Sequence, residues 1–169
     1  MKPVTLEMAR PSGERERFVA LYEAHGSAVL AYARRRLAAD EAEDILAETF
    51  LVAWRRRRDV PSDALPWLYA VAGNVVRNRH RTERRREALH ARIASQPVAV
   101  EDAPDPKLRD ALAQLKPIDR EALLLTAWEG LTPERAARAA GCSRATFHVR
   151  LHRARGRLAD ALARIEEQS

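Results

Sequence analysis

Residues 130–158 read GLTPERAARAAGCSRATFHVRLHRARGRL, a pattern that predicts a helix-turn-helix. Thr132 is a favourable N-cap for the first helix, and Pro133 follows at the first helical position, where a missing N–H is tolerated. Gly141 supplies the left-handed residue that a tight turn between two helices requires. Ser143 then stands where it can cap a second helix. We therefore expect two helices joined by a short turn.

The second of these helices has two contrasting faces. Its apolar stripe of helical period consists of Phe147, Leu151, Ala154 and Leu158. The opposite face carries small and polar residues with arginines at its edges, a combination that fits the major groove of DNA. The candidate DNA-reading residues are Ser143, Arg144, Thr146, His148, Val149, Arg150, His152 and Arg153, and further along Arg155 and Arg157 are expected to meet phosphates. A helical hairpin with a solvated basic face is the alternative.

The composition favours a polyanionic partner. The chain has 169 residues, 30 of them Lys or Arg, and a formal net charge of +6. Most of these cations are arginines, the side chains best suited to phosphates and guanine edges. A nucleic acid is therefore the expected partner, and an acidic membrane surface is the weaker alternative. The sequence has neither a long apolar run nor a signal-peptide core, so we expect a cytoplasmic protein without membrane insertion.

The fold class predicted from the sequence is all-α. Alanine and leucine are plentiful, and no run of β-branched residues alternates with polar ones. The stretch 96–106, QPVAVEDAPDP, has the composition of a linker. We therefore expect two small helical domains over 13–94 and 107–165, joined by a flexible linker over 95–106. Within the second domain, Ile118 and Trp128 are expected to join the core.

The first helix is expected to begin near Glu14 and to continue to Ala38 with an interruption at Gly26. Arg34, Arg35 and Arg36 follow one another near its end. Their place relative to the apolar residues predicts that they lie on or beside the solvent side of the helix.

A second helix, expected over 40–57, carries an acidic face. One arc of it holds Asp40, Glu41, Asp44 and Glu48. Acidic residues at a helix start also complement the helix dipole, which is the purely structural explanation. DNA would nevertheless repel such a face, so we expect this helix to bind a basic surface of a protein partner.

A third helix, expected over 66–94 after a loop at 59–65, becomes strongly basic from Arg77 onward. Basic residues at this density repel one another and favour a polyanion, so the helix predicts a second nucleic-acid surface. A solvated basic helix is the alternative. Trp67, near the start of this helix, fits either core packing or stacking on an unpaired base.

Nothing in the sequence predicts catalysis. It lacks a Ser/His/Asp or Cys/His arrangement and a glycine-rich phosphate loop, and no cleft accompanies the acidic residues of 40–48, so we do not expect an enzyme. His148 and His152 lie one helical turn apart with Cys142 nearby, a pattern that can hold a metal. Because both histidines lie on the outward face of the predicted reading helix, we expect neither a metal nor another cofactor.

The order of these parts resembles the extracytoplasmic-function (ECF) sigma factors of the sigma-70 family of bacterial RNA polymerase. DEAEDILAETFLVAW at 40–54 resembles regions 2.1–2.2, PWLYAVAGNVVRNRHRTERRR at 66–86 resembles regions 2.3–2.4, and 108–158 resembles region 4. Gly73 is a departure, since arginine is common there in the family. The resemblance implies a protein that directs core polymerase to specific promoters and helps to open the duplex.

The resemblance also implies roles for individual residues. The match to the helix that docks on the polymerase β′ coiled coil consists of Asp44, Glu48, Thr49, Phe50 and Trp54. The expected contacts to the promoter −10 element are Trp67, Asn74, Arg77, Asn78 and Arg81. Residues 59–66 match the loop that captures a flipped base, and the helix from Ser143 matches the −35 reader.

The resemblance implies three partners: core RNA polymerase, through its β′ coiled coil and β flap, promoter DNA and, as a further class that the family allows, an anti-sigma factor. Two rival interpretations remain at this point. One is a stand-alone helix-turn-helix transcriptional regulator that acts as a dimer, and the other is an arginine-rich RNA-binding or nucleoid protein.

Overall fold

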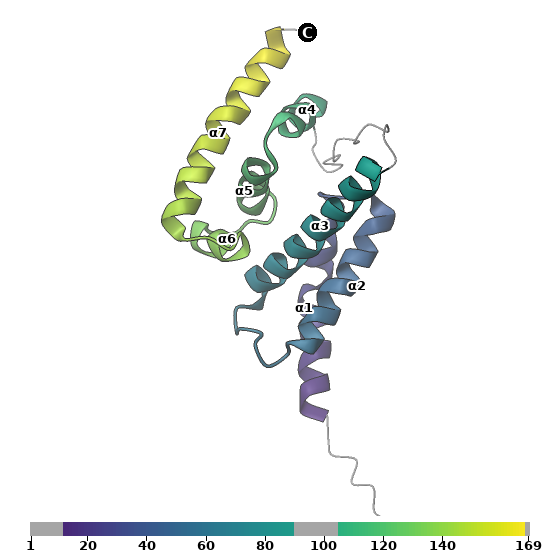
Figure 1. Ribbon diagram of the computed structural model, residues 1–169. Helices are drawn as coiled ribbons and strands as arrows, with labels where there is room; N and C mark the ends of the chain where they lie inside the picture. Colours follow the sequence, from purple (N-terminus) through teal and green to yellow (C-terminus); the bar gives the residue numbers. More distant parts are fainter. Residues whose placement is uncertain (1–11, 90–104, 168–169) are drawn as a thin grey trace, which may run out of the picture.

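The computed structural model describes residues 12–89 and 105–167, which form seven helices and no strand (Figure 1). The all-α prediction is confirmed. The helices are α1 (Ser12–Arg34), α2 (Ala39–Arg55), α3 (Ala64–Leu89), α4 (Pro106–Gln114), α5 (Pro117–Ala127), α6 (Pro133–Ala139) and α7 (Arg144–Glu167). The predicted linker and the expected end of the third helix fall largely on 90–104, outside the described residues.

Helices α1, α2 and α3 pack together as one group. Val29, Ile45 and Leu68, one from each helix, are fully buried, because each helix turns an apolar face toward the other two. The Phe18 ring meets the Phe50 ring edge-on at 6.1 Å between centroids. This packing fixes the outer faces of α2 and α3, on which Asp44, Glu48 and most of the predicted −10 residues lie.

Helix α1 differs from its prediction in two respects. It continues without a break through Gly26, so the expected interruption is wrong. A glycine inside a helix costs only about 1 kcal/mol relative to alanine, which packing against α2 and α3 offsets. The helix also ends at Arg34, and Arg36, expected at the solvent side, is buried with 6% of its surface exposed.

Helices α4 to α7 form the second group, in which α7 packs against the other three. The predicted stripe is confirmed for Phe147, Leu151 and Ala154, which are buried, while Leu158 is half-buried. Ile118 is 49% exposed, so its expected place in the core is wrong. Its side chain instead lines a groove between the start of α5 and α7.

The predicted helix-turn-helix is present with its caps. The Thr132 hydroxyl accepts a hydrogen bond from the Arg135 backbone N–H at 3.4 Å, and the Ser143 hydroxyl accepts one from the Thr146 N–H at 3.1 Å. Gly141 has φ of +65°, the left-handed conformation that the turn requires. The local chemistry of the sequence therefore decides this part of the fold.

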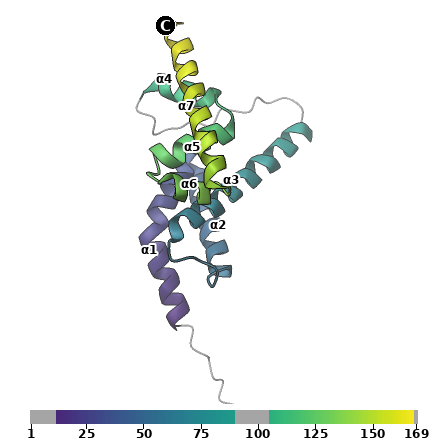
Figure 2. The same cartoon turned by 90° about the vertical axis from the view of Figure 1, so that its left-hand side faces the viewer.

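The two groups of helices contact each other, chiefly through α3 and α6 (Figures 1 and 2). Helix α6 also packs on α7, so it separates the two helices that are predicted to meet DNA. The C-terminal end of α3 points away from the second group in Figure 2.

Candidate nucleic-acid and protein interfaces

The outward face of α7 carries the residues predicted to read DNA. Arg144, His148, His152 and Arg153 are exposed, and Val149 is 51% exposed, a large value for an apolar side chain. At the start of the helix, the Ser143 and Thr146 hydroxyls lie 2.8 Å apart. The arrangement offers cationic edges for guanine and phosphate, together with an apolar surface suited to a thymine methyl group.

A groove of about 620 Å³ separates the start of α5 from this face of α7. Its cationic lining consists of Lys116, Arg150, Arg153 and Arg157, and its apolar lining includes Ile118 and Val149. Cations spaced along such a groove suit a phosphate backbone. Lys116 and Ile118 were not foreseen as members of this surface, because they lie outside the helix-turn-helix.

Arg157 has a partner that the sequence pattern does not reveal. Its Nη1 donates a hydrogen bond to Oδ2 of Asp119, a residue in the first turn of α5 that is only 3% exposed. The arginine therefore neutralises a buried carboxylate. Of the two arginines expected to meet phosphates, Arg157 is thus held by α5, whereas Arg155 is simply exposed.

Arg144 is also tied to a neighbouring helix. Its Nε lies 3.0 Å from Oε1 of Glu134, in the first turn of α6. A hydrogen bond to its own backbone lowers the pKa of the Glu134 carboxyl, and the charge of Arg144 lowers it further. The pair bridges the starts of α6 and α7 on the surface, so a base contact by Arg144 would compete with this ion pair.

The predicted −10 surface lies on α3. The side chains of Asn74, Arg77, Asn78 and Arg81 are exposed, and Arg77 Nη2 donates to Asn74 Oδ1 at 2.6 Å. Trp67 is half-buried against the core, and the Arg56 guanidinium lies 5.7 Å from its ring centroid. Trp67 therefore combines partial core packing with an accessible ring, a position that fits both of its predicted roles.

The acidic face of α2 has an intramolecular counter-ion. Arg79 of α3 lies 3.7 Å from Glu41, 3.3 Å from Asp44 and 3.5 Å from Glu48. The sequence places Arg79 in the basic run and gives no sign of this contact, which depends on how α3 crosses α2. Asp44 and Glu48 keep 66% and 53% of their side-chain surface exposed, so a partner can still reach them.

Not every residue predicted to bind polymerase is accessible. Thr49 and Phe50 are 0% and 4% exposed, and Trp54 is half-buried with its ring 5.1 Å from that of Phe18. Thr49 and Phe50 can therefore support the acidic face from beneath but cannot touch a partner in this arrangement. Leu51 and Tyr22 were not among the residues predicted to bind polymerase, yet their surfaces are 47% and 46% exposed.

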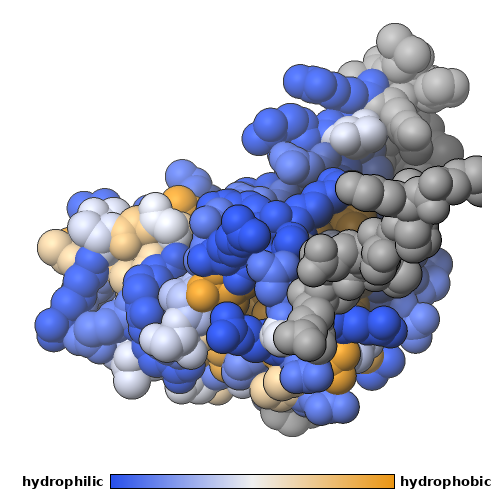
Figure 3. All heavy atoms as spheres, turned by 90° about the horizontal axis from the view of Figure 1, so that it is seen from below, coloured by the Kyte–Doolittle hydropathy of each residue, from blue (hydrophilic) through white to orange (hydrophobic). Residues whose placement is uncertain are grey.

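Two negative findings concern only residues 12–89 and 105–167. No group of three or more His, Cys, Asp or Glu side chains there is arranged to hold a metal ion. No helix within the same ranges is long and apolar enough to cross a membrane. On the face seen in Figure 3, hydrophilic residues cover most of the surface and hydrophobic residues appear between them in patches.

Comparison with protein families gives two matches in chain order. The family described as Sigma-70 region 2 matches residues 21–86, and Sigma-70, region 4 matches residues 106–158. Among curated proteins, RNA polymerase sigma factor CarQ of Myxococcus xanthus is 32% identical over 91% of this chain and 94% of its own length. ECF RNA polymerase sigma factor SigL of Mycobacterium tuberculosis is 33% identical over 86% and 90%.

Two solved structures are similar over both groups of helices. The sigma factor RpoE of Bartonella quintana, in complex with the anti-sigma factor NepR, has a TM-score of 0.68 and 26% identity, over 88% of this chain and 98% of that chain. CnrH, in complex with the cytosolic domain of CnrY, has a TM-score of 0.66 and 27% identity, over 94% and 93%.

Proposed function

The chain belongs to the sigma-70 family, as an RNA polymerase sigma factor of the ECF group, and we propose how its surfaces share the work of promoter recognition. It directs core RNA polymerase to promoters and initiates DNA-templated transcription. A stand-alone regulator would leave residues 21–86 without a role, so that alternative is not favoured. We further propose that the protein works in the cytoplasm and carries out no bond chemistry of its own.

The exposed acidic face of α2 is the proposed docking surface for the polymerase β′ coiled coil. The observation that carries this proposal is the exposure of Asp44 and Glu48 on a chain whose net charge is +6. Opposite charge on the partner would accelerate docking and fix its register. A basic side chain of polymerase would compete with Arg79 for these carboxylates, while the buried Thr49 and Phe50 would hold α2 in position.

The exposed face of α3 and the segment 59–66, whose last three residues form the start of that helix, are the proposed −10 surface. Asn74, Arg77, Asn78 and Arg81 would meet the backbone and the melted strand, and residues 59–66 would hold an unstacked base. Unstacking a base costs a few kcal/mol, which stacking and loop contacts can offset. Strand opening then requires binding energy alone.

Helix α7 is the proposed −35 reader. Arg144, His148 and Val149 occupy its outward face near the N-terminal end, where a recognition helix approaches base edges. Arg150 and Arg153 line the neighbouring groove, where phosphates would lie. We extend to this chain a contact with an anti-sigma factor, because the similar RpoE was solved with one. The further contact proposed with the polymerase β flap rests on the resemblance to the family alone.

Charge reversal on the acidic face tests the proposal. We expect Asp44→Arg with Glu48→Arg to weaken binding to core polymerase by more than about 10-fold, because attraction becomes repulsion. The matched control is Glu16→Arg with Glu23→Arg, the same change on exposed positions of α1. Titration of labelled core polymerase measures both pairs. Equal affinity of the two double variants would remove the assignment of α2.

A further inference from the structure

Arg79 of α3 lies on the acidic face of α2 that is proposed to receive core polymerase. Its guanidinium is 3.7 Å from Glu41, 3.3 Å from Asp44 and 3.5 Å from Glu48. Three carboxylates and one guanidinium leave a formal charge of −2, whereas the carboxylates alone would carry −3. Arg79 therefore already makes the contacts that a basic side chain of the partner would make.

The contacts of Arg79 are loose and open to water. All three distances are longer than the range of about 2.7–2.9 Å that is typical of charge-assisted hydrogen bonds. Asp44 and Glu48 are exposed, and Arg79 keeps 24% of its side-chain surface in contact with solvent. Because water competes for ion pairs of this kind, they contribute little to stability. A charged group of a partner can therefore exchange with Arg79 at small cost.

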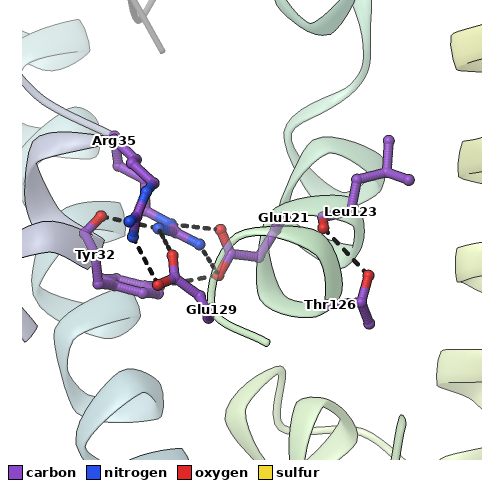
Figure 4. Close-up of polar contacts among 7 residues, drawn as sticks. Tyr32, Arg35, Glu121, Leu123, Thr126 and Glu129 are labelled. Atoms are coloured by element: carbon purple, nitrogen blue, oxygen red, sulfur yellow. Dashed lines mark hydrogen bonds and ion pairs between the residues drawn. The ribbon is translucent and has the colours of Figure 1, made fainter. Parts of the chain in front are cut away.

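The ion pairs drawn in Figure 4 show the opposite construction. Arg36 has its Nε 2.7 Å from Glu121 Oε2 and its Nη1 2.9 Å from Glu129 Oε1. The side chains of Arg36 and Glu129 are only 7% and 2% exposed. Breaking a buried pair leaves a charge with neither water nor a partner, which is strongly unfavourable. Arg36 is therefore tightly held, whereas Arg79 is held by contacts that a partner can replace.

The surroundings of Arg79 have room for a second basic side chain. A hollow of about 430 Å³ lies between α2 and α3, and Arg79 forms part of its wall. The other residues that line it are Glu41, Glu48, Val75, Asn78, Thr82 and Glu83. The carboxylates suit a guanidinium or ammonium group, and Val75 offers an apolar surface to the aliphatic stem of such a side chain. An arginine or a lysine of the partner therefore fits this hollow.

We propose that Arg79 is an internal competitor for core polymerase, which occupies the place of a basic polymerase side chain and so weakens polymerase binding. The inference rests on the proposed docking of polymerase on α2. When polymerase binds, its basic side chain takes over the contacts with Asp44 and Glu48 that Arg79 gives up. Because only the fraction of molecules with these carboxylates unoccupied is ready to bind, the apparent affinity is lower than the acidic face alone would provide.

Removing the charge of Arg79 tests the competition. An exposed ion pair is worth about 1.4- to 5-fold in an equilibrium constant, so Arg79→Gln should raise the affinity for core polymerase by about 3- to 10-fold. Arg79→Lys keeps the charge and should bind like the wild type. The control Arg84→Gln removes an equal charge from an exposed position of the same helix and should change the affinity by less than about 2-fold, because salt screens a distant charge. Titration of labelled core polymerase measures all three variants.

Thermal unfolding distinguishes competition from a merely structural role. Without Arg79 the carboxylates of α2 repel one another, so Arg79→Gln should lower Tm by about 2 °C while it raises the affinity. A residue that only holds α2 in position would lower both quantities, and a loss of folding would likewise show that role. In the Glu48→Gln background the gain from Arg79→Gln should be smaller, because one of the contested contacts is already gone.

The outcomes separate the competition from the docking site on which it rests. If Arg79→Gln binds no more tightly than the wild type while charge reversal at Asp44 and Glu48 still weakens binding, the competition is wrong and the docking site stands. Equal gains for Arg79→Gln and Arg84→Gln would also overturn the competition, because net charge alone would then explain them. If charge reversal at Asp44 and Glu48 has no effect either, the docking site fails and the competition fails with it.

Discussion

Replacing Arg157 by alanine should destabilise the protein, although the residue lies in the predicted DNA-binding helix. The change leaves the Asp119 carboxylate, whose side chain is 4% exposed, without its charged partner. Removing one member of a fully buried ion pair costs roughly 3–5 kcal/mol. Arg157 itself is 47% exposed, so water reaches the pair, and we expect a loss of about 2 kcal/mol.

Thermal unfolding followed by circular dichroism measures this loss. For a cooperative unit of 150–250 residues, about 2 kcal/mol corresponds to a fall in Tm of about 4–8 °C. Asp119→Asn in the Arg157→Ala background should recover a large part of it, because the uncompensated charge is removed. The resulting double-mutant cycle isolates the coupling between the two side chains.

Arg155→Ala is the matched control, since Arg155 is an exposed arginine on the same helix. It should leave Tm unchanged and reduce the salt dependence of DNA binding by about one phosphate contact, a slope of roughly 0.9. The reasoning fails if Arg157→Ala melts like the wild type and loses the same salt slope as the control. Arg157 would then be a phosphate ligand, as the sequence pattern alone suggests.

Three further predictions concern the other surfaces. Arg144→Ala and His148→Ala should each change which −35 sequences are transcribed in a run-off assay over a randomised library, because a base contact discriminates by about 1–3 kcal/mol. Equal losses of transcription on every sequence would show that α7 positions the protein on DNA without recognising bases. Thr49→Val should raise the free energy of unfolding by about 1 kcal/mol and leave polymerase binding intact, because the buried hydroxyl has no hydrogen-bond partner. Weaker binding would mean that Thr49 touches polymerase. The lowered pKa of Asp63 means that its ion pairs with Arg135 and Arg138 stabilise the folded protein fully above the ordinary pKa of 3.8, and that this contribution is lost as the pH falls through the lowered pKa. Asp63→Asn should therefore remove that part of the fall in Tm on acidification.

The parts of the fold that depend on local chemistry follow directly from the sequence. Thr132, Gly141 and Ser143 decide the helix-turn-helix through capping and backbone conformation, which act within a few residues. The buried stripe of α7 follows from period alone. The helix-turn-helix and the exposed acidic face therefore lie within the reach of sequence reasoning.

Contacts between side chains that lie far apart in the chain cannot be predicted from the sequence in this way. The sequence places Arg79 and Arg157 among other basic residues and gives Asp119 no role, and only the crossing of the helices shows which charges meet. Thr49 and Phe50 are buried although they match a family's binding helix, because such a match does not reveal which residues of the helix face inward. Periodicity gives the faces of a helix but not what lies against a polar face.

Arg36 lies on a polar surface of the first group of helices that the second group covers. The sequence carries one sign of this contact, which is Gly73. A run of arginines at a helix end predicts solvent exposure, yet Glu121 and Glu129, 85 and 93 residues further along, bury this one. Neither glutamate stands out locally, because an acidic residue on a helix surface needs no explanation. Gly73 does stand out, since glycine inside a helix costs about 1 kcal/mol and α3 needs no bend there. Its missing Cβ leaves room for the Tyr32 hydroxyl, which donates a hydrogen bond to Glu121, so an otherwise unnecessary glycine points to a close neighbour that the pattern of charges conceals.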